Sequence, residues 1–276
     1  MAYLKTKGTI TGAAARVLPR FVDMDDIASD VHCTKYYPLF DPDGSKPFWT
    51  LDGDDIIRVE NLANAADPWT QPDVGRRPVR EWSDTLGRFV ARMKADFQSY
   101  MDSPEPFQWG NAHTVAMLIK VPLNAARAFQ AAVGQFSATL PNSAGIVVTY
   151  NAGTPGSEFR ITHRIGSLPG GADAAKYVAI GDEWVLIVVG YNGNAAGTKT
   201  AYLAANNGAV DPQTISTGPT GVTGFSLGHS GSQSIDGKMA LVIGYDINLF
   251  DPANADRLAD LYAHARQFAA SAVPIA

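Results

Sequence analysis

The residues that could do chemistry most directly lie near the end of the chain. The stretch Gly228-His229-Ser230-Gly231-Ser232 resembles the G-x-S-x-G turn that presents a nucleophilic serine, and Asp251 and His264 follow it in the order serine, acid, histidine. If these side chains met in the fold, the histidine could take the serine proton and the aspartate could orient the histidine. Whether they meet depends on the elements that carry them.

The surroundings of Ser230 do not suit a nucleophile. Such a turn needs a buried strand before the serine and a helix directly after it. Here Asp236-Gly237 indicates a turn, and Met239–Tyr245 is an apolar run typical of a strand. The last position of the motif is Ser232 instead of glycine, and only about 45 residues follow Ser230. We therefore interpret this stretch as a loop between strands and expect no catalytic residue in it.

Other reactive patterns are also missing from the sequence. It contains no glycine-rich phosphate loop, and the histidines at 32, 113, 163, 229 and 264 form no H-E-x-x-H pair. The E-x-D-x-x-E triplet of retaining glucanases does not occur, and Asp182 and Glu183 are neighbours that would point to opposite faces of a strand. We expect no enzymatic activity, no cofactor and no metal. A carboxylate pair formed between distant strands stays open as an alternative.

Composition narrows the class of protein. Of 276 residues, 46% are hydrophobic and 18% are charged, which suits a folded chain with a sizeable core. The net charge of -5, without a lysine- or arginine-rich run, argues against a nucleic-acid partner. The 26 glycines and 17 prolines indicate many turns, as in an all-β protein. Cys33 is the single cysteine, and we expect it to serve as a small apolar residue.

Residues 1–45 lack clear periodicity and predict an N-terminal arm or a couple of edge strands. The start of this segment has no apolar core typical of a signal peptide. No segment of the chain reaches the run of about 18 apolar residues that a membrane helix needs. We therefore expect a protein made in the cytoplasm, without a membrane partner, whose arm docks on another protein.

From residue 46 onward the pattern is mostly one of strands. Short apolar runs alternate with glycine- and proline-rich turns, which favours an antiparallel β-sandwich over βαβ units. Within the segment at about 72–108, apolar residues over Val79–Tyr100 recur at three- and four-residue steps, which predicts an inserted amphipathic helix. Near the end, Asp251-Pro252 suits the start of a C-terminal helix with an apolar stripe over Leu258–Phe268.

Three stretches, in order, resemble the concanavalin A-like lectin/glucanase jelly rolls, and within them the laminin-G-like (LamG) branch. They are "LDGDDIIRVEN" (51–61), "IGDEWVLIVVGYNGNAAGTKTAYLAANNG" (180–208) and "FSLGHSGSQSIDGKMALVIGYDINL" (225–249), which "ADRLADLYAHA" follows. The resemblance implies a LamG-like jelly-roll domain over 46–276, interrupted by the predicted helix. The chain departs from the family in lacking further cysteines and an obvious acidic cluster for calcium, so calcium-dependent sugar binding stays open.

The resemblance also implies a function. LamG-like jelly rolls occur on phage capsids and tails, where they decorate surfaces or touch host glycans, and a virion protein needs no export signal. We therefore expect a non-enzymatic structural protein of a phage virion, as capsid or tail decoration or a fibre component, with a lectin-like domain for host-surface glycans. Its expected partners are other virion proteins, reached through residues 1–45, and copies of itself. The alternatives are a free carbohydrate-binding lectin and a glycan-cleaving enzyme on the same fold.

Glycan binding of this kind needs exposed aromatic side chains that can cover a sugar ring. The candidates for such a carbohydrate-binding platform are Tyr36, Tyr37, Trp69 and Trp109. Trp49 and Trp184 lie within strand patterns, so we expect both in the core. Trp82 lies on the apolar stripe of the predicted insertion helix and is not a candidate.

Overall fold

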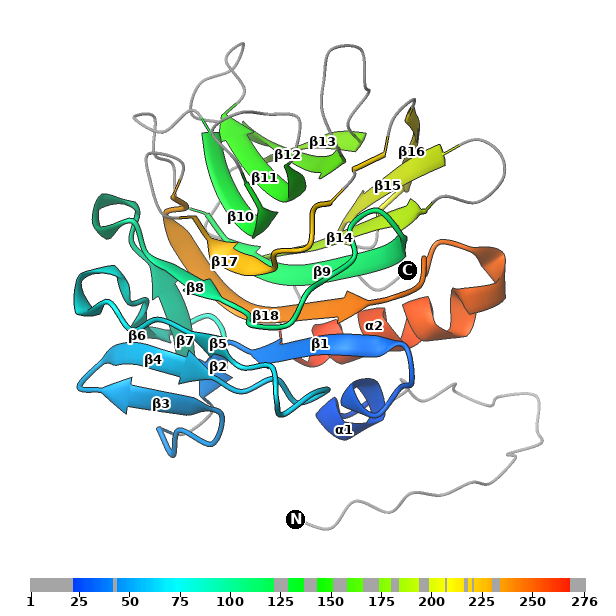
Figure 1. Ribbon diagram of the computed structural model, residues 1–276. Helices are drawn as coiled ribbons and strands as arrows, with labels where there is room; N and C mark the ends of the chain where they lie inside the picture. Colours follow the sequence, from blue (N-terminus) through cyan, green and yellow to red (C-terminus); the bar gives the residue numbers. More distant parts are fainter. Residues whose placement is uncertain are drawn as a thin grey trace, which may run out of the picture.

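The computed structural model describes residues 22–41, 44–121, 129–136, 143–150, 158–165, 174–179, 184–193, 199–206, 208–215, 218–219, 221–229 and 234–268. These residues form an antiparallel jelly-roll β-sandwich with a helix near the C-terminus (Figure 1). The all-β fold class predicted from the sequence is confirmed. Among the described residues, no helix has the length and apolar character that crossing a membrane requires.

One layer of the sandwich is built around the long strands β9, β14 and β18. Its order is β16 (Asp211–Ile215), β15 (Lys199–Ala205), β14 (Val185–Asn192), β9 (Ala112–Lys120), β18 (Gly237–Tyr245) and β1 (Cys33–Pro38). β9 lies between β14 and β18, with Val188 and Ile243 both opposite Ala116. The first and last described strands of the chain, β1 and β18, therefore lie side by side.

The second layer faces the first and is assembled from shorter strands. Its order is β13 (Ala174–Ala179), β12 (Glu158–Ile165), β11 (Ala144–Tyr150), β10 (Phe129–Gln135), β17 (Ser226–Gly228), β8 (Tyr100–Asp102), β5 (Trp69–Thr70), β4 (Asp55–Val59) and β3 (Trp49–Asp52). The hairpin of β6 (Val79–Ser83) and β7 (Arg88–Met93) joins the layers, because β6 pairs with β4 and β7 pairs with β18 and with β2 (Phe40–Asp41).

The first layer is covered on both faces, which explains its continuous apolar strands. Met117 and Ile187 point into the core between the two layers. Their neighbours Leu118 and Leu186 point the other way, into a second core beneath the C-terminal helix. A sheet buried on both sides loses the alternation of apolar and polar residues that a one-sided sheet shows.

The C-terminal helix predicted from the sequence is confirmed as α2 (Ala255–Phe268), which a 3-10 turn, η4 (Pro252–Asn254), precedes. The carboxylate of Asp251 accepts a hydrogen bond of 2.9 Å from the amide of Ala253, as a capping residue should. Leu261 and Ala265 are fully buried against the first layer. The core assignments of Trp49 and Trp184, and the buried position of Cys33, are also confirmed.

The predicted insertion helix is wrong. The segment 72–108 contains β6, β7 and β8, with only the short 3-10 turns η1 (Val74–Arg76) and η2 (Ala95–Phe97). Ser83 pairs with Arg88 across a tight turn in which Gly87 has φ +62°, a conformation that glycine adopts without strain. Val79 and Trp82, three residues apart, lie on opposite faces of β6, and Trp82 is 45% exposed, so the helical period does not describe this hairpin.

The boundary of the predicted N-terminal arm is also corrected. Residues 22–41 contain α1 (Met24–Ala28), β1 and β2, and β1 pairs with β18 over Cys33–Pro38. These strands belong to the sandwich, because β1 pairs with the long strand β18 and β2 pairs with β7. Residues 1–21 lie outside the described residues, so a docking role for that part of the arm stays a prediction.

Candidate functional site

The four aromatic residues predicted to form a carbohydrate platform are all buried in the sandwich. Tyr36, Tyr37, Trp69 and Trp109 each have 0% exposure. A sugar ring stacks on an aromatic face that is open to solvent, and none of these faces is. The predicted platform is therefore wrong for these residues.

Each of these residues has an internal partner that accounts for its burial. Tyr37 stacks on Trp69 with the ring centroids 3.8 Å apart. The indole of Trp69 donates to the backbone oxygen of Phe225, and that of Trp109 donates to the backbone oxygen of Gly224, both at 2.8 Å. A buried indole needs such an acceptor. The aromatic cluster thus ties the segment before β17 to β1 and β5.

Two members of the serine–acid–histidine series have other partners. Asp251 caps the C-terminal helix. His264 is buried on α2, where its Nδ1 donates to the backbone oxygen of Val22 at 2.9 Å and its Nε2 accepts from the Tyr36 hydroxyl at 2.6 Å. Burial lowers the pKa of His264. Both ring nitrogens are therefore engaged; Ser230 lies outside the described residues.

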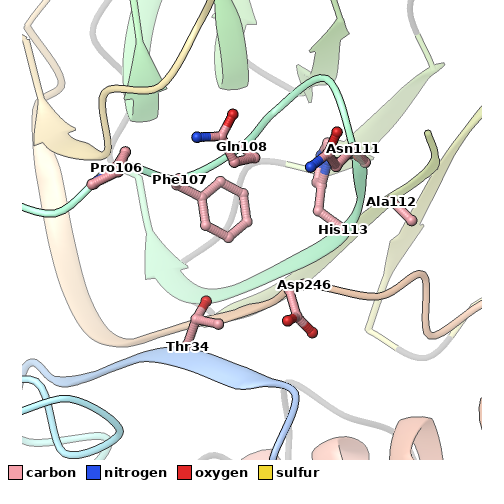
Figure 2. A pocket seen from close by; sticks show the side chains of 8 residues that line it. All are labelled: Thr34, Pro106, Phe107, Gln108, Asn111, Ala112, His113 and Asp246. Carbon is pink, nitrogen blue, oxygen red and sulfur yellow. Dashed lines mark hydrogen bonds between the residues drawn. The ribbon is translucent and has the colours of Figure 1, made fainter. Parts of the chain in front are cut away.

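A pocket of about 290 Å³ lies where the β8–β9 connection passes over the ends of β1 and β18. Figure 2 shows Asn111 and Gln108 on the connection above it, with Thr34 and Asp246 below and the ring of Phe107 between them. The lining is completed by Pro106, Ala112 and His113. We call this site the β8–β9 pocket.

The polar groups of the β8–β9 pocket match the hydroxyls of a small polar ligand. Gln108 and Asn111 are exposed, and a side-chain amide both donates and accepts hydrogen bonds. Asp246 offers a carboxylate whose Oδ1 lies 2.9 Å from Nδ1 of His32, at the exposed side of the site. Pro106 and Ala112 add apolar surface, and buried Phe107 lies behind them. Polar groups that converge around an apolar patch are typical of a ligand site.

The β8–β9 connection, which forms the rim of the pocket, is anchored to the core by buried side chains and backbone hydrogen bonds. Phe107 and Trp109 are buried while Gln108 between them is exposed, so inward and outward side chains alternate. The amide of Phe107 donates to the backbone oxygen of Thr223 at 2.7 Å, and that of Asn111 donates to the backbone oxygen of Gln108 at 2.9 Å. The rim residues are therefore positioned before any ligand arrives.

A buried ion pair also supports the start of this connection. Nζ of Lys35 lies 2.5 Å from Oδ2 of Asp67, and both side chains are almost completely buried. Lys35 also donates to Ser103 at 3.0 Å and to the backbone oxygen of Glu105 at 2.9 Å, while Asp67 accepts from the amide of Glu105. Tyr37 and Asn61 donate to the same carboxylate. A buried ion pair is tolerated when its remaining donors and acceptors are satisfied in this way.

The shifts in pKa within this cluster follow from burial. Burial lowers the pKa of Lys35, and Asp67 opposes that effect. Burial also raises the pKa of the Tyr37 hydroxyl. These groups touch one another and the backbone of the rim, so they hold the pocket in place instead of facing a ligand.

Two histidines that lie 50 residues apart in the sequence meet beneath the pocket. Nε2 of His113 on β9 lies 3.5 Å from Nε2 of His163 on β12. Burial lowers the pKa of His113 to about 4 and that of His163 well below its usual value. Within the described part of the chain, no group of three histidine, cysteine or acidic residues is arranged to hold a metal ion. The pair therefore belongs to the core between the layers.

Sequence reasoning missed the residues of the β8–β9 pocket. Gln108 and Asn111 belong to no sequence motif. Asp246 joins the pocket only because β18 ends beside the β8–β9 connection. The one usable signal was the alternation of Phe107 and Trp109 with polar residues, which indicates a loop anchored on one side. This signal identifies the loop, but it does not identify the residues at the ends of β1 and β18 that complete the pocket.

Comparisons with known proteins support the fold. The chain is similar to the binding domain of Paraclostridial Mosquitocidal Protein 1, with a TM-score of 0.51 and 11% identity over 84% of this chain and 52% of that chain. It is also similar to the Trypanosoma rangeli sialidase solved in complex with the inhibitor DANA, with a TM-score of 0.52 and 10% identity over 85% of this chain and 33% of that chain.

These similarities cover only part of the other proteins. The chain spans about half the length of the toxin chain and about a third of the sialidase chain. No protein-family model matches the sequence, and no curated protein matches it at a significant level. At such low identity the comparisons show that this chain has a β-sandwich fold of the kind found in these binding and sialidase structures.

Proposed function

We propose that this chain is a lectin-like module that binds glycans in the β8–β9 pocket. The observation that carries the proposal is the pocket itself, in which Gln108, Asn111 and Asp246 converge around the apolar surface of Pro106 and Ala112. Sugar hydroxyls both donate and accept hydrogen bonds, so amide and carboxylate side chains suit them. The volume of about 290 Å³ suits one or two sugar units.

The finer role is that of a LamG-like, non-enzymatic component of a phage virion, placed on a capsid, tail or fibre, which touches host-surface glycans. The resemblance of the three sequence stretches to LamG jelly rolls supports this role. The partners in the particle are other virion proteins, bound through the N-terminal residues, and further copies of the chain. Similarity in fold to a toxin binding domain fits a role in recognition.

A printed array of neutral, amino and acidic saccharides, probed with the full chain, tests glycan binding. We expect at least one class of saccharide to retain the protein and Asn111→Ala to reduce that retention at least about tenfold, because an amide that makes two hydrogen bonds is lost. The matched control is Asn64→Ala, which replaces an asparagine outside the pocket. Equal retention of wild type and Asn111→Ala would refute the proposed site.

The virion role has its own test. Antibodies against the chain should label purified phage particles in electron micrographs, and the full chain should release no reducing sugar from the saccharides that it binds. Particles without label would overturn the virion role, and sugar release would overturn the non-enzymatic role. Neither result would affect the glycan array.

A further inference from the structure

A second hollow of about 300 Å³ lies at the opposite end of β18 from the β8–β9 pocket. Its lining residues come from β6, β7, η2 and the residue before β18: Glu81, Arg92, Lys94, Ala95, Asp96, Phe97 and Asp236. We call it the β7 hollow. Asp236 precedes β18 (Gly237–Tyr245) and Asp246 follows it, so each end of one strand contributes a carboxylate to a different hollow.

Phe97 gives the β7 hollow an exposed aromatic side chain. Its exposure is 58%, whereas the aromatic residues predicted as a platform are fully buried. Phe97 ends the short turn η2, which buried Ala95 anchors and Gln98 closes in the left-handed conformation at φ +51°. The Lys94 ammonium lies 5.4 Å from the centroid of the Phe97 ring. The ring therefore lies on the surface, beside a cation.

Three polar side chains of the hollow, those of Glu81, Arg92 and Asp236, form a connected row with Lys238 beside it. Arg92 Nη1 lies 2.6 Å from Asp236, and Arg92 Nε lies 3.7 Å from Glu81. Lys238 on β18 lies 2.6 Å from the other oxygen of Glu81. These contacts fix the direction of the side chains while leaving them partly exposed, at 21–43% of their side-chain area. Such a row offers both donors and acceptors to a ligand.

We infer that the β7 hollow is a second saccharide-binding site, in which a sugar ring stacks on Phe97 and its hydroxyls bond to Glu81, Arg92 and Asp236. The inference rests on the proposed function of the module. Carboxylates and cations alternate in the hollow, so a highly charged ligand of either sign meets repulsion there. A neutral ring with hydroxyls at its edge and an apolar face satisfies both the charged row and the phenyl ring.

The distance between the two sites predicts that they bind different sugar units of one glycan-coated surface. Ten residue steps separate Asp236 from Asp246 across β18, which at about 3.3 Å per residue places the two carboxylates roughly 30 Å apart. One sugar unit cannot reach both sites, whereas a surface coated with glycans can fill both. Filling two sites on one rigid body raises the apparent affinity far above that of either site.

Four full-length proteins test this inference: the wild type, Phe97→Ala, Asn111→Ala and the double variant. Val74→Ala is the control, because Val74 is also exposed, at 62%, on a short 3-10 turn. The probe is the printed saccharide array, with folding checked by circular dichroism and oligomeric state by sedimentation. We expect Phe97→Ala to lower the apparent affinity at least about tenfold, and the double variant to lose retention.

The outcomes separate this inference from the proposed function. Loss of retention in Phe97→Ala with no change in Asn111→Ala would keep the β7 hollow as a glycan site and refute the β8–β9 pocket. Loss in Asn111→Ala alone would refute the hollow and keep the pocket. A change in sedimentation of Phe97→Ala without a change in sugar retention would make the hollow a protein interface and overturn the inference. An array that retains no protein would overturn both.

Discussion

The molecule contains two clusters of charged side chains, which are made of the same kinds of residue but have different roles. Lys35 and Asp67 are sealed inside the sandwich, where their polar atoms bond to Tyr37, Asn61, Ser103 and the backbone of Glu105. Arg92, Glu81 and Asp236 lie on the surface around a hollow. Burial therefore decides the role of each cluster: the first fixes the rim of the β8–β9 pocket, and the second is open to a ligand.

The largest expected loss of stability is that of Asp67→Ala. This change leaves the Lys35 ammonium buried without its carboxylate, so we expect a loss of about 3–5 kcal/mol in the free energy of unfolding. Urea denaturation followed by fluorescence measures it. In the double variant Lys35→Met/Asp67→Ala no unpaired charge remains. The total loss of stability in this variant should therefore be smaller than the sum of the losses in the two single variants.

The control for that prediction is Glu60→Ala. Arg58 and Glu60 form an ion pair at 2.7 Å, with about a third of each side chain exposed. Such pairs contribute about 0–1 kcal/mol. Similar losses of stability in Asp67→Ala and Glu60→Ala would contradict the distinction between the buried and the exposed ion pair.

The buried histidines make the stability of the fold depend on pH. Burial lowers the pKa of His113 from 6.5 to about 4 and lowers the pKa of His163 and His264. Between about pH 6.5 and pH 4 the unfolded chain binds protons that the folded chain does not, so stability present above pH 6.5 is lost as the pH falls through this window. The shift at His113 corresponds to a loss of up to about 3 kcal/mol.

Urea titrations at pH 7 and pH 4 measure that loss. His113→Gln should flatten the dependence on pH, because one of the buried groups no longer titrates. An equal slope in His113→Gln and the wild type would refute the role of the buried imidazole.

The smallest expected effect on stability belongs to the open cluster. Arg92→Gln removes the contact of 2.6 Å with Asp236, and we expect it to change the free energy of unfolding by about 1 kcal/mol or less. The same variant should lose saccharide retention at the β7 hollow, because a donor in the charged row is gone. A stability loss as large as that of Asp67→Ala would place Arg92 among the structural charges.

The fold was readable from the sequence where local signals agree with the tertiary structure. Asp251 and Pro252 predict the start of a helix, and the apolar stripe of Leu258–Phe268 predicts the face that packs. The hairpin β6–β7 was misread because the four-residue step from Phe89 to Met93 fits both a helical and a strand period, and only Gly87 marked the turn. Periodicity cannot separate two periods over so short a run.

The sites were harder to predict, because burial depends on partners far away in the chain. Tyr36 and Tyr37 lie in a segment without clear periodicity, yet β1 places them on the two faces of the first layer, where Tyr36 packs beneath α2 and Tyr37 stacks on Trp69 in the core between the layers. Phe97 was expected on the buried stripe of a helix, and its exposure on η2 follows from the turn that replaces that helix. Only the pairing of the strands reveals which aromatic residues face solvent.

The most direct test of the account is a nuclear magnetic resonance titration of the full chain with a saccharide that the array retains. Glycan binding in the β8–β9 pocket should shift the backbone amides of Gln108, Asn111 and Asp246 with a common saturation curve, while the amides around buried Lys35 and Asp67 change little. Saturable shifts confined to other parts of the surface would contradict the β8–β9 pocket as the glycan site.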